Sequence, residues 1–320
     1  MFVSALIGLG NIAWKYDAQA PAGLPPLSQG GAMLARSDLR LAGGCSPEPA
    51  DRSGFAAWRP GLAVFSEAEE MLAAVKPDLV GLCSPTELHF HHARLCLEAG
   101  VKALWLEKPP TATPEELTRL TRQTEECGAV VLVNYSRRYL PVYQRLRQCL
   151  ASGRLGPCRL IRLMYSPGLA RNGVHLLDQL FFLTGADDYE ILWVERGMGL
   201  ASPGFALRLS TGHLVEACGG DLPYHTNDLA AVCEQGVLAI NRGGKIAHAE
   251  LSRENDLYPG FYDLHDEPDL LGPGGLTGAM DSALADLVAA MTSGRRPESN
   301  LYSAALTQRL MDDLLRGCRP

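Results

Sequence analysis

The first 135 residues alternate short apolar runs with longer amphipathic stretches. This pattern predicts βαβ units built around a parallel sheet. The apolar runs are nearly continuous, as expected for strands that are buried on both faces. The predicted strands cover residues 2–9, 39–45, 78–83, 102–106 and 130–134, and the predicted helices cover residues 67–75, 87–99 and 114–127. The segment 19–31 is rich in proline and glycine, so we expect a loop there, beside the ligand.

The pattern changes after residue 135. Apolar spacing predicts helices at 142–152 and 174–183, a strand at 159–166, and several strands between 189 and 246 joined by glycine turns. Residues 277–316 return to helical spacing, with a break at 294–297. We therefore predict an α/β protein of two domains. Residues 1–135 form the parallel-sheet domain. Residues 136–320 form an α+β domain with an open, mostly antiparallel sheet, and its last helices are expected to pack back on the first domain.

Composition excludes several classes of function. The 320 residues carry a formal net charge of −7, and the basic residues form no run that would neutralise a nucleic-acid backbone. Nucleic acid is therefore not an expected partner. No apolar run reaches the roughly 18 to 20 residues that cross a bilayer, so we expect no membrane association and a soluble, cytoplasmic protein. The nine scattered cysteines form no C-x-x-C pair, which indicates reduced thiols rather than disulfides or structural zinc.

A glycine-rich turn follows the first predicted strand. Gly8 and Gly10 belong to a G-x-G-x-x-A sequence that also contains Asn11 and Ile12. Glycines let the backbone approach a pyrophosphate, and the start of the following helix favours its negative charge. Because the turn opens a βαβαβ pattern, it predicts a dinucleotide-binding Rossmann domain rather than an ordinary strand-to-helix connection.

The end of the second predicted strand should contact the ribose of that dinucleotide. No acidic residue stands directly at this strand end, where the chain continues with Ser46. Ser46 and Arg52 would accept a 2′-phosphate, whereas Glu48 would hold a free 2′-hydroxyl if the loop bends back. The cofactor is therefore NAD or NADP, and the sequence leaves this choice open.

The loop after the strand at 78–83 lies at the carboxyl edge of the sheet, where such folds bind their ligands. The candidate cofactor contacts there are Cys83, Ser84, Pro85, Thr86 and His89. Ser84 or Thr86 would alternatively cap the next helix. The histidines between residues 89 and 92 project to different sides of a helix, and no neighbouring acid or cysteine completes a ligand set. We therefore expect no metal site.

Two positions are candidates for proton chemistry. Glu107, Lys108 and Pro109 follow the strand at 102–106, and a lysine at that strand end would point toward the nicotinamide, where partial burial tunes its ammonium group. In the second domain His175 precedes Asp178 by three residues on one helical face. A histidine exchanges protons near neutral pH. The alternatives are a surface lysine and a histidine that is satisfied by Asp178.

Together these motifs resemble the Gfo/Idh/MocA family of NAD(P)-dependent sugar and inositol oxidoreductases. The matching segments, in the family's order, are Gly8-x-Gly10-x-x-Ala13, Cys83-Ser84-Pro85-Thr86-x-x-His89, Glu107-Lys108-Pro109, Asn134-Tyr135-Ser136-Arg137-Arg138-Tyr139 and Gly173-Val174-His175-x-x-Asp178. The resemblance implies a Rossmann domain followed by a domain whose open sheet forms homodimer or homotetramer contacts.

The resemblance also implies roles for individual residues. Lys108 corresponds to the lysine near the nicotinamide and the reacting oxygen, His175 to the acid/base histidine, and Asn134 to a residue beside the nicotinamide. Many inositol dehydrogenases of the family carry an aspartate where this chain has Arg171. An arginine there favours an anionic substrate. The alternative is that Arg171 pairs with Asp178 or with another carboxylate of the protein.

The expected reaction is hydride transfer between a nicotinamide and a carbinol or keto carbon of a sugar, anionic or nucleotide-linked. The candidate substrate-binding residues are Arg138, Tyr165, Arg171, Asn172 and Asp178. Two alternatives remain: a dehydrogenase of a non-sugar carbonyl, dihydrodiol or polyol, and a nucleotide-binding regulatory protein without turnover. The sequence does not decide the direction of the reaction.

Overall fold

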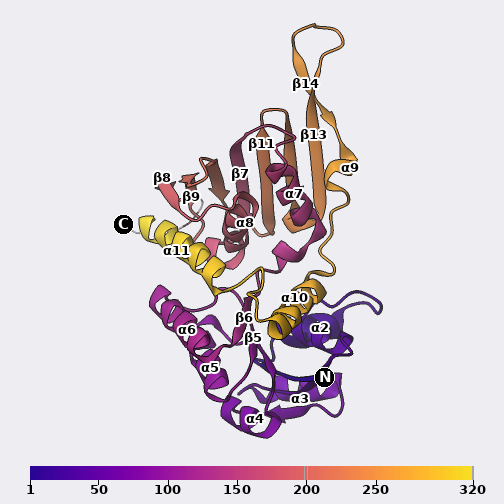
Figure 1. Ribbon diagram of the computed structural model, residues 1–320, viewed down its shortest axis with the longest axis vertical. Coiled ribbons are helices and arrows are strands. Elements are labelled where there is room, and N and C mark those ends of the chain that lie inside the picture. The colour runs from indigo at the N-terminus through magenta and orange to yellow at the C-terminus, as the bar shows by residue number, and fades with distance from the viewer. Residues whose placement is uncertain (198, 200, 319–320) are drawn as a thin grey trace. The chain divides into compact units, whose positions relative to one another are not determined.

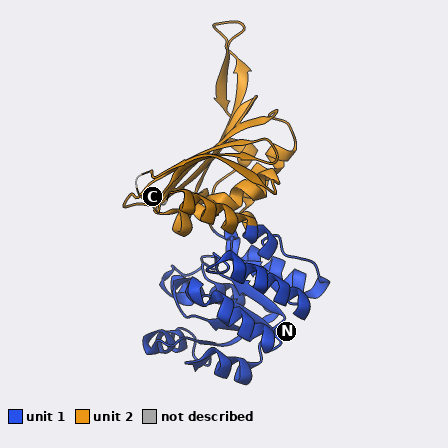
Figure 2. Ribbon diagram, turned by 90° about the vertical axis from the view of Figure 1, so that its left-hand side faces the viewer, with its two compact units in different colours: residues 1–136, 277–305 blue, residues 137–276, 306–320 orange. Residues whose placement is uncertain are grey.

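The computed structural model describes residues 1–197, 199 and 201–318. The chain divides into two compact units, which Figure 2 shows in separate colours. The first unit contains residues 1–136 and 277–305, and the second contains residues 137–276 together with the chain from residue 306 onward. Among the described residues, no helix is both long and apolar enough to span a membrane.

The first unit is built on a six-stranded sheet with the order β3-β2-β1-β4-β5-β6, in which all paired strands are parallel. The strands are β1 (Phe2–Ile7), β2 (Leu39–Cys45), β3 (Ala63–Phe65), β4 (Leu79–Leu82), β5 (Ala103–Leu106) and β6 (Val130–Val133). This is the Rossmann strand order, which confirms the predicted fold. The sequence missed β3, an edge strand of three residues whose first two are exposed.

The helices that accompany this sheet include two that begin at a capping hydroxyl. The helices are α1 (Tyr16–Gln19), α2 (Gln29–Ala35), α3 (Pro49–Trp58), α4 (Ala68–Val75), α5 (Thr86–Glu98), α6 (Pro114–Cys127) and α10 (Ala279–Ser293), preceded by the short π-helix η1 (Asn11–Lys15). The Thr113 hydroxyl caps α6 by accepting from the Glu116 amide at 3.2 Å. The loop expected at 19–31 ends early, because the Ser28 hydroxyl accepts from the Gly31 amide and starts α2 inside it.

The second unit contains an eight-stranded sheet with the order β14-β13-β12-β11-β7-β10-β9-β8. Its strands are β7 (Cys158–Ser166), β8 (Tyr189–Glu195), β9 (Gly204–Leu209), β10 (Leu214–Gly219), β11 (Thr226–Cys233), β12 (Gly236–Asn241), β13 (Ile246–Glu254) and β14 (Tyr262–Asp266). The pairing is antiparallel except between β10 and β7. The predicted open, mostly antiparallel sheet is confirmed. Strand β14 and all of β13 after its first residue, Ile246, lie beyond the region in which strands were predicted.

Helices lie on one face of this sheet (Figure 1). They include α7 (Pro141–Ala151), which contacts β12, and α8 (Val174–Thr184), which contacts β11; the remaining helical segments are η2 (Ser136–Tyr139), η3 (Leu169–Gly173), η4 (Arg242–Gly244), α9 (Pro268–Leu271) and α11 (Leu301–Gly317). Strand residues that face these helices, such as Leu163, Phe205 and Leu229, are buried. Their alternating neighbours, such as Met164, form a second face that none of the described helices of this unit covers.

Candidate functional site

The glycine turn after β1 has the geometry that a dinucleotide requires. Gly8 adopts φ +85°, and a Cβ there would lie 2.5 Å from the Ser84 amide nitrogen at the end of β4. At Gly10 a Cβ would meet no atom within 4 Å. Gly8 therefore permits close packing of two strand ends, whereas Gly10 leaves open backbone over which a pyrophosphate can lie. Asn11, exposed, and Ile12, half-buried, open η1 directly after this turn.

The loop after β2 contains both acidic and basic groups. Arg52 donates from Nη1 to the Ser46 carbonyl at 2.7 Å and to the Pro47 carbonyl at 2.8 Å. Asp51 lies beside the Ser46 hydroxyl and forms a 2.6 Å ion pair with Lys15. The Arg52 guanidinium is thus held at the strand end where a dinucleotide's ribose is expected.

His89 connects two loops that the sequence assigned to the cofactor. Its ring is buried, with Nε2 at 2.8 Å from the Ser84 carbonyl and Nδ1 at 2.9 Å from the Pro109 carbonyl. Burial lowers the pKa of His89, and the two carbonyls oppose that shift. The Ser84 hydroxyl in turn contacts Nδ1 of His92 at 2.9 Å. His89 therefore holds the loops after β4 and β5 together within the first unit, and both of its ring nitrogens are used in doing so.

Glu107 is the centre of a polar network at the ends of β5 and β6. Its carboxylate accepts from Nδ2 of Asn134 at 2.5 Å and from Nε2 of Gln29 at 2.9 Å. Trp105 donates to Oδ1 of Asn134 at 3.2 Å, which fixes the orientation of that amide. Burial raises the pKa of Glu107, while the two amides and Lys108 oppose the shift. Sequence reasoning missed Gln29, because it assigned that position to a loop.

The remaining candidates of the first unit lie at the same strand ends. Cys83 follows β4, and burial raises the pKa of its thiol well above the usual range. Pro85 precedes α5 and Thr86 is its first residue. Lys108 is half-buried directly after Glu107. The predicted cofactor residues thus gather at the carboxyl ends of β1, β2, β4, β5 and β6, the edge at which parallel sheets bind nucleotides.

His175 is the second residue of α8 and is half-buried. Asp178, one turn further, is fully buried and forms a bidentate ion pair with Arg138, with distances of 2.8 Å to Nε and 2.6 Å to Nη2. Burial raises the pKa of Asp178, and the Arg138 guanidinium opposes this shift. Because this carboxylate and guanidinium pair with each other inside the unit, we do not retain Arg138 and Asp178 as substrate-binding residues.

Two further substrate candidates have structural contacts instead. Nδ2 of Asn172 donates at 2.6 Å to the carbonyls of both Ser166 and Thr226, so both amide hydrogens are occupied. The Tyr165 hydroxyl donates to the Pro203 carbonyl at 2.5 Å, and its ring lies against Gly173. Of the five candidates, Arg171 in η3 is the one that is exposed.

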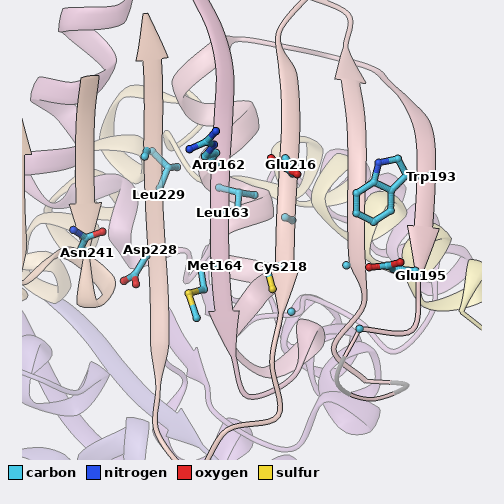
Figure 3. A pocket seen from close by; sticks show the side chains of 15 residues that line it. Arg162, Leu163, Met164, Trp193, Glu195, Glu216, Cys218, Asp228, Leu229 and Asn241 are labelled. Carbon is cyan, nitrogen blue, oxygen red and sulfur yellow. The ribbon is translucent and has the colours of Figure 1, made fainter. Parts of the chain in front are cut away.

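A shallow hollow of about 490 Å³ lies on the uncovered face of the second sheet (Figure 3). Arg162, Met164, Glu216, Cys218 and Asp228 project into it from neighbouring strands. No residue proposed from the sequence as catalytic or substrate-binding lines this hollow. It is therefore a feature of the open sheet face rather than of the candidate active site.

The strand order and the glycine turn define the first unit as a dinucleotide-binding Rossmann domain. Residues 3–135 match the family model described as "Oxidoreductase family, NAD-binding Rossmann fold". This domain belongs to the Gfo/Idh/MocA family, as its motifs indicated, and the expected cofactor class, NAD or NADP, is confirmed.

Curated relatives match over part of their length. A D-glucoside 3-dehydrogenase of Escherichia coli (strain K12) is 28% identical over 200 residues, which are 57% of this chain and 53% of that protein. A UDP-N-acetylglucosamine 3-dehydrogenase of Acidithiobacillus ferrooxidans is 28% identical over 206 residues, 62% of this chain and 58% of that protein. The alignments thus span little more than half the length of these relatives.

Solved structures support the fold of both units. A mutant of a 3-ketoreductase from Actinomadura kijaniata, in complex with TDP-benzene and NADP, matches with a TM-score of 0.78 at 18% identity. The match covers 99% of this chain and 98% of that one. At this identity the likeness establishes the architecture, and the substrate must be argued separately.

Proposed function

We propose that this protein is an NAD(P)-dependent oxidoreductase that transfers a hydride between the nicotinamide and C3 of a nucleotide-linked or otherwise anionic sugar. The observation that carries the proposal is the glycine turn at Gly8 and Gly10 together with the buried Glu107 network beside Lys108. The named relatives act at a position 3, which supports the choice of carbon. Reduction of a 3-keto sugar and oxidation of the alcohol are the two directions of this one reaction.

Three residues of this chain receive roles in the proposal. Lys108 stabilises the negative charge that develops on the reacting oxygen, and His175 exchanges the hydroxyl proton. The bound cofactor supplies the hydride. Arg171 contacts the anionic group of the substrate, because it is an exposed residue and a guanidinium binds anionic groups through charge-assisted hydrogen bonds.

We further propose that NADP(H) is preferred over NAD(H). Asp51, the acidic group beside Ser46, is paired with Lys15, and the Arg52 guanidinium is anchored to the same loop. A 2′-phosphate would find the Arg52 guanidinium there, whereas a free 2′-hydroxyl would find Asp51 already paired with Lys15. Glu48, the other acid that could hold the hydroxyl, is exposed two residues after Ser46. Titration with NADPH and NADH should give at least a tenfold lower Kd for NADPH, and Arg52→Ala should remove most of that difference.

The catalytic assignment is tested by turnover of the Lys108→Ala and His175→Ala variants. Each should lower kcat by roughly 100-fold or more, the usual contribution of a proton-transfer or oxyanion-stabilising group, while the Kd for NADPH changes little. Lys102→Ala is the matched control, because Lys102 is an exposed lysine near the start of the same strand and pairs with Asp78. Wild-type turnover in both test variants would refute the assignment.

The substrate is tested with a UDP-sugar, a neutral glucoside, an inositol and a cyclic dihydrodiol. The proposal expects turnover of the UDP-sugar, with a KM that rises in Arg171→Ala, while any activity on the neutral glucoside is unaffected by that change. Preferred turnover of the dihydrodiol or the inositol would favour the non-sugar dehydrogenase. Cofactor binding without turnover of any of the four would favour a regulatory protein.

We also propose that the uncovered sheet face mediates a homodimer or homotetramer. Large apolar side chains are exposed on it, including Met164, Trp193 and Leu214. Exposed apolar patches of this kind usually mark interaction surfaces. Light scattering after size-exclusion chromatography should give a mass of two or four chains, and a monomeric mass at micromolar concentration would contradict the proposal.

A further inference from the structure

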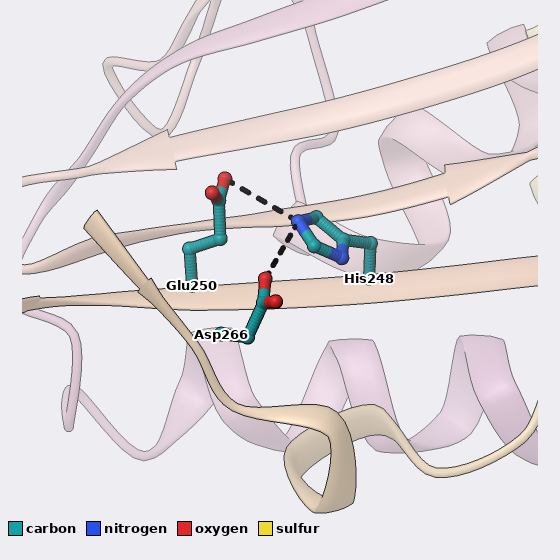
Figure 4. A group of neighbouring side chains, drawn as sticks. All are labelled: His248, Glu250 and Asp266. Atoms are coloured by element: carbon teal, nitrogen blue, oxygen red, sulfur yellow. Dashed lines mark ion pairs between the residues drawn. The ribbon is translucent and has the colours of Figure 1, made fainter.

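A histidine and two carboxylates meet at the edge of the second sheet, and none of the three is a residue assigned to the reaction. His248 and Glu250 lie two residues apart on β13, so their side chains share one face of the strand. Asp266 of β14 pairs directly with Glu250 in the antiparallel register. Figure 4 shows the three side chains pointing toward one another.

The two separations from His248 are longer than good hydrogen bonds and close to those between two ligands of one metal ion. Nε2 of His248 is 3.5 Å from Oε2 of Glu250 and 3.5 Å from Oδ1 of Asp266. A good N–H···O hydrogen bond is about 2.7 to 3.2 Å long. With metal–ligand bonds of about 2.1 Å, tetrahedral ligands lie about 3.4 Å apart. All three ligand atoms lie within 4.8 Å of one another.

The negative charges in the cluster also favour a bound cation. Glu250 and Asp266 are directly opposite each other, and like charges at such a pair destabilise a sheet. On the other side, the cross-strand neighbours of His248 and Glu250 on β12 are Ala239 and Val237, which bring no positive charge.

We propose that His248, Glu250 and Asp266 bind one divalent transition-metal ion of the Zn²⁺ class. One imidazole nitrogen and two carboxylate oxygens suit zinc, cobalt or manganese, whereas calcium and magnesium prefer all-oxygen sets. Water or a further side chain would complete the coordination. The ion would cross-link β14, whose five residues are all exposed and which lies at the edge of the sheet beside β13. Its role would be structural, and it departs from the sequence-based expectation of no metal site.

The test is Co²⁺ titration of tag-free protein, followed by visible absorption and calorimetry. The expected result is one Co²⁺ per chain with the weak d–d bands of nitrogen and oxygen ligands, displaced by Zn²⁺. His248→Asn should raise the Kd at least tenfold, and so should Asp266→Asn. His265→Asn is the matched control, because His265 neighbours Asp266 but projects to the other face of β14.

A second readout keeps the test independent of folding and of the proposed oxidoreductase activity. Zn²⁺ should slow hydrogen exchange at the amides of β14 in the wild type and in His265→Asn but not in His248→Asn. Sulfur-to-cobalt charge-transfer bands would show that cysteines hold the metal and would overturn the proposal. Equal affinity in His248→Asn and the wild type would overturn it as well.

Discussion

Replacing Gly8 by alanine should destabilise the first unit and weaken cofactor binding together. The backbone at this position has φ +85°, where a Cβ costs about 1 to 2 kcal/mol. The new Cβ would also lie 2.5 to 2.7 Å from backbone atoms of Cys83 and Ser84. Because these are backbone atoms, relief requires the end of β4 to move, at about 1 to 3 kcal/mol. The sum is a loss of about 2 to 5 kcal/mol in the free energy of unfolding.

Gly10→Ala is the matched comparison, because the same methyl group is added two residues later in open space. Gly10 has φ −83° and ψ −161°, which alanine adopts readily. The free energy of unfolding of Gly10→Ala should equal that of the wild type or exceed it by up to about 1 kcal/mol. Its methyl group would nevertheless occupy the surface proposed for the pyrophosphate, so the Kd for NADPH should rise at least tenfold.

Denaturant unfolding followed by tryptophan fluorescence suits this pair of variants. Trp14, Trp58 and Trp105 all belong to the first unit, so the signal reports mainly on that unit. Calorimetric titration with NADPH then gives the binding constants. The reasoning is refuted if Gly8→Ala unfolds at the wild-type denaturant concentration. It is equally refuted if Gly10→Ala binds NADPH as the wild type does.

Two further predictions concern stability. Asp178→Asn leaves the buried Arg138 guanidinium without its counter-charge, so the free energy of unfolding should fall by about 3 to 5 kcal/mol. Glu234→Gln, in the exposed pair with Arg159, should lower it by at most about 1 kcal/mol. Equal losses in the two variants would contradict this account. Burial, reinforced by neighbouring histidines, lowers the pKa of His92 from 6.5 to about 4. Between pH 6.5 and 4 the unfolded chain binds a proton at His92 and the folded protein does not, so the contribution of His92 to folding stability is full above pH 6.5 and is lost as the pH falls toward 4. The melting temperature of His92→Asn should therefore fall less steeply with decreasing pH than that of the wild type over this range.

Much of the fold was predictable because the signals are local. Continuous apolar runs located β1, β2, β4, β5 and β6 within one or two residues, and the Thr113 cap and Pro114 located the start of α6. Strand β3 was not predictable, because it is a short edge strand with little burial. The start of α2 at Ser28 was missed, since one capping hydroxyl overrides the low helix propensity of two glycines.

The site shows the same division between local and long-range information. The sequence predicted the glycine turn and Lys108 as parts of the site, because each belongs to a motif of fixed spacing. It did not show that Gln29 would bond to Glu107, because these residues lie 78 positions apart. It also assigned Asn172 to the substrate, whereas both of its amide hydrogens bind backbone carbonyls that only the folded sheet brings near.

The sequence by itself determined the class of fold and the cofactor class, and it predicted the strand ends at which the site residues lie. These depend on hydrophobic periodicity and on backbone freedom at single glycines, which are properties of neighbouring residues. Only the tertiary structure decided which polar groups are already paired: it joined Arg138 to Asp178, and it brought His248 and Glu250 to Asp266 across two strands. Such pairings depend on strand register and burial, which no short stretch of sequence encodes.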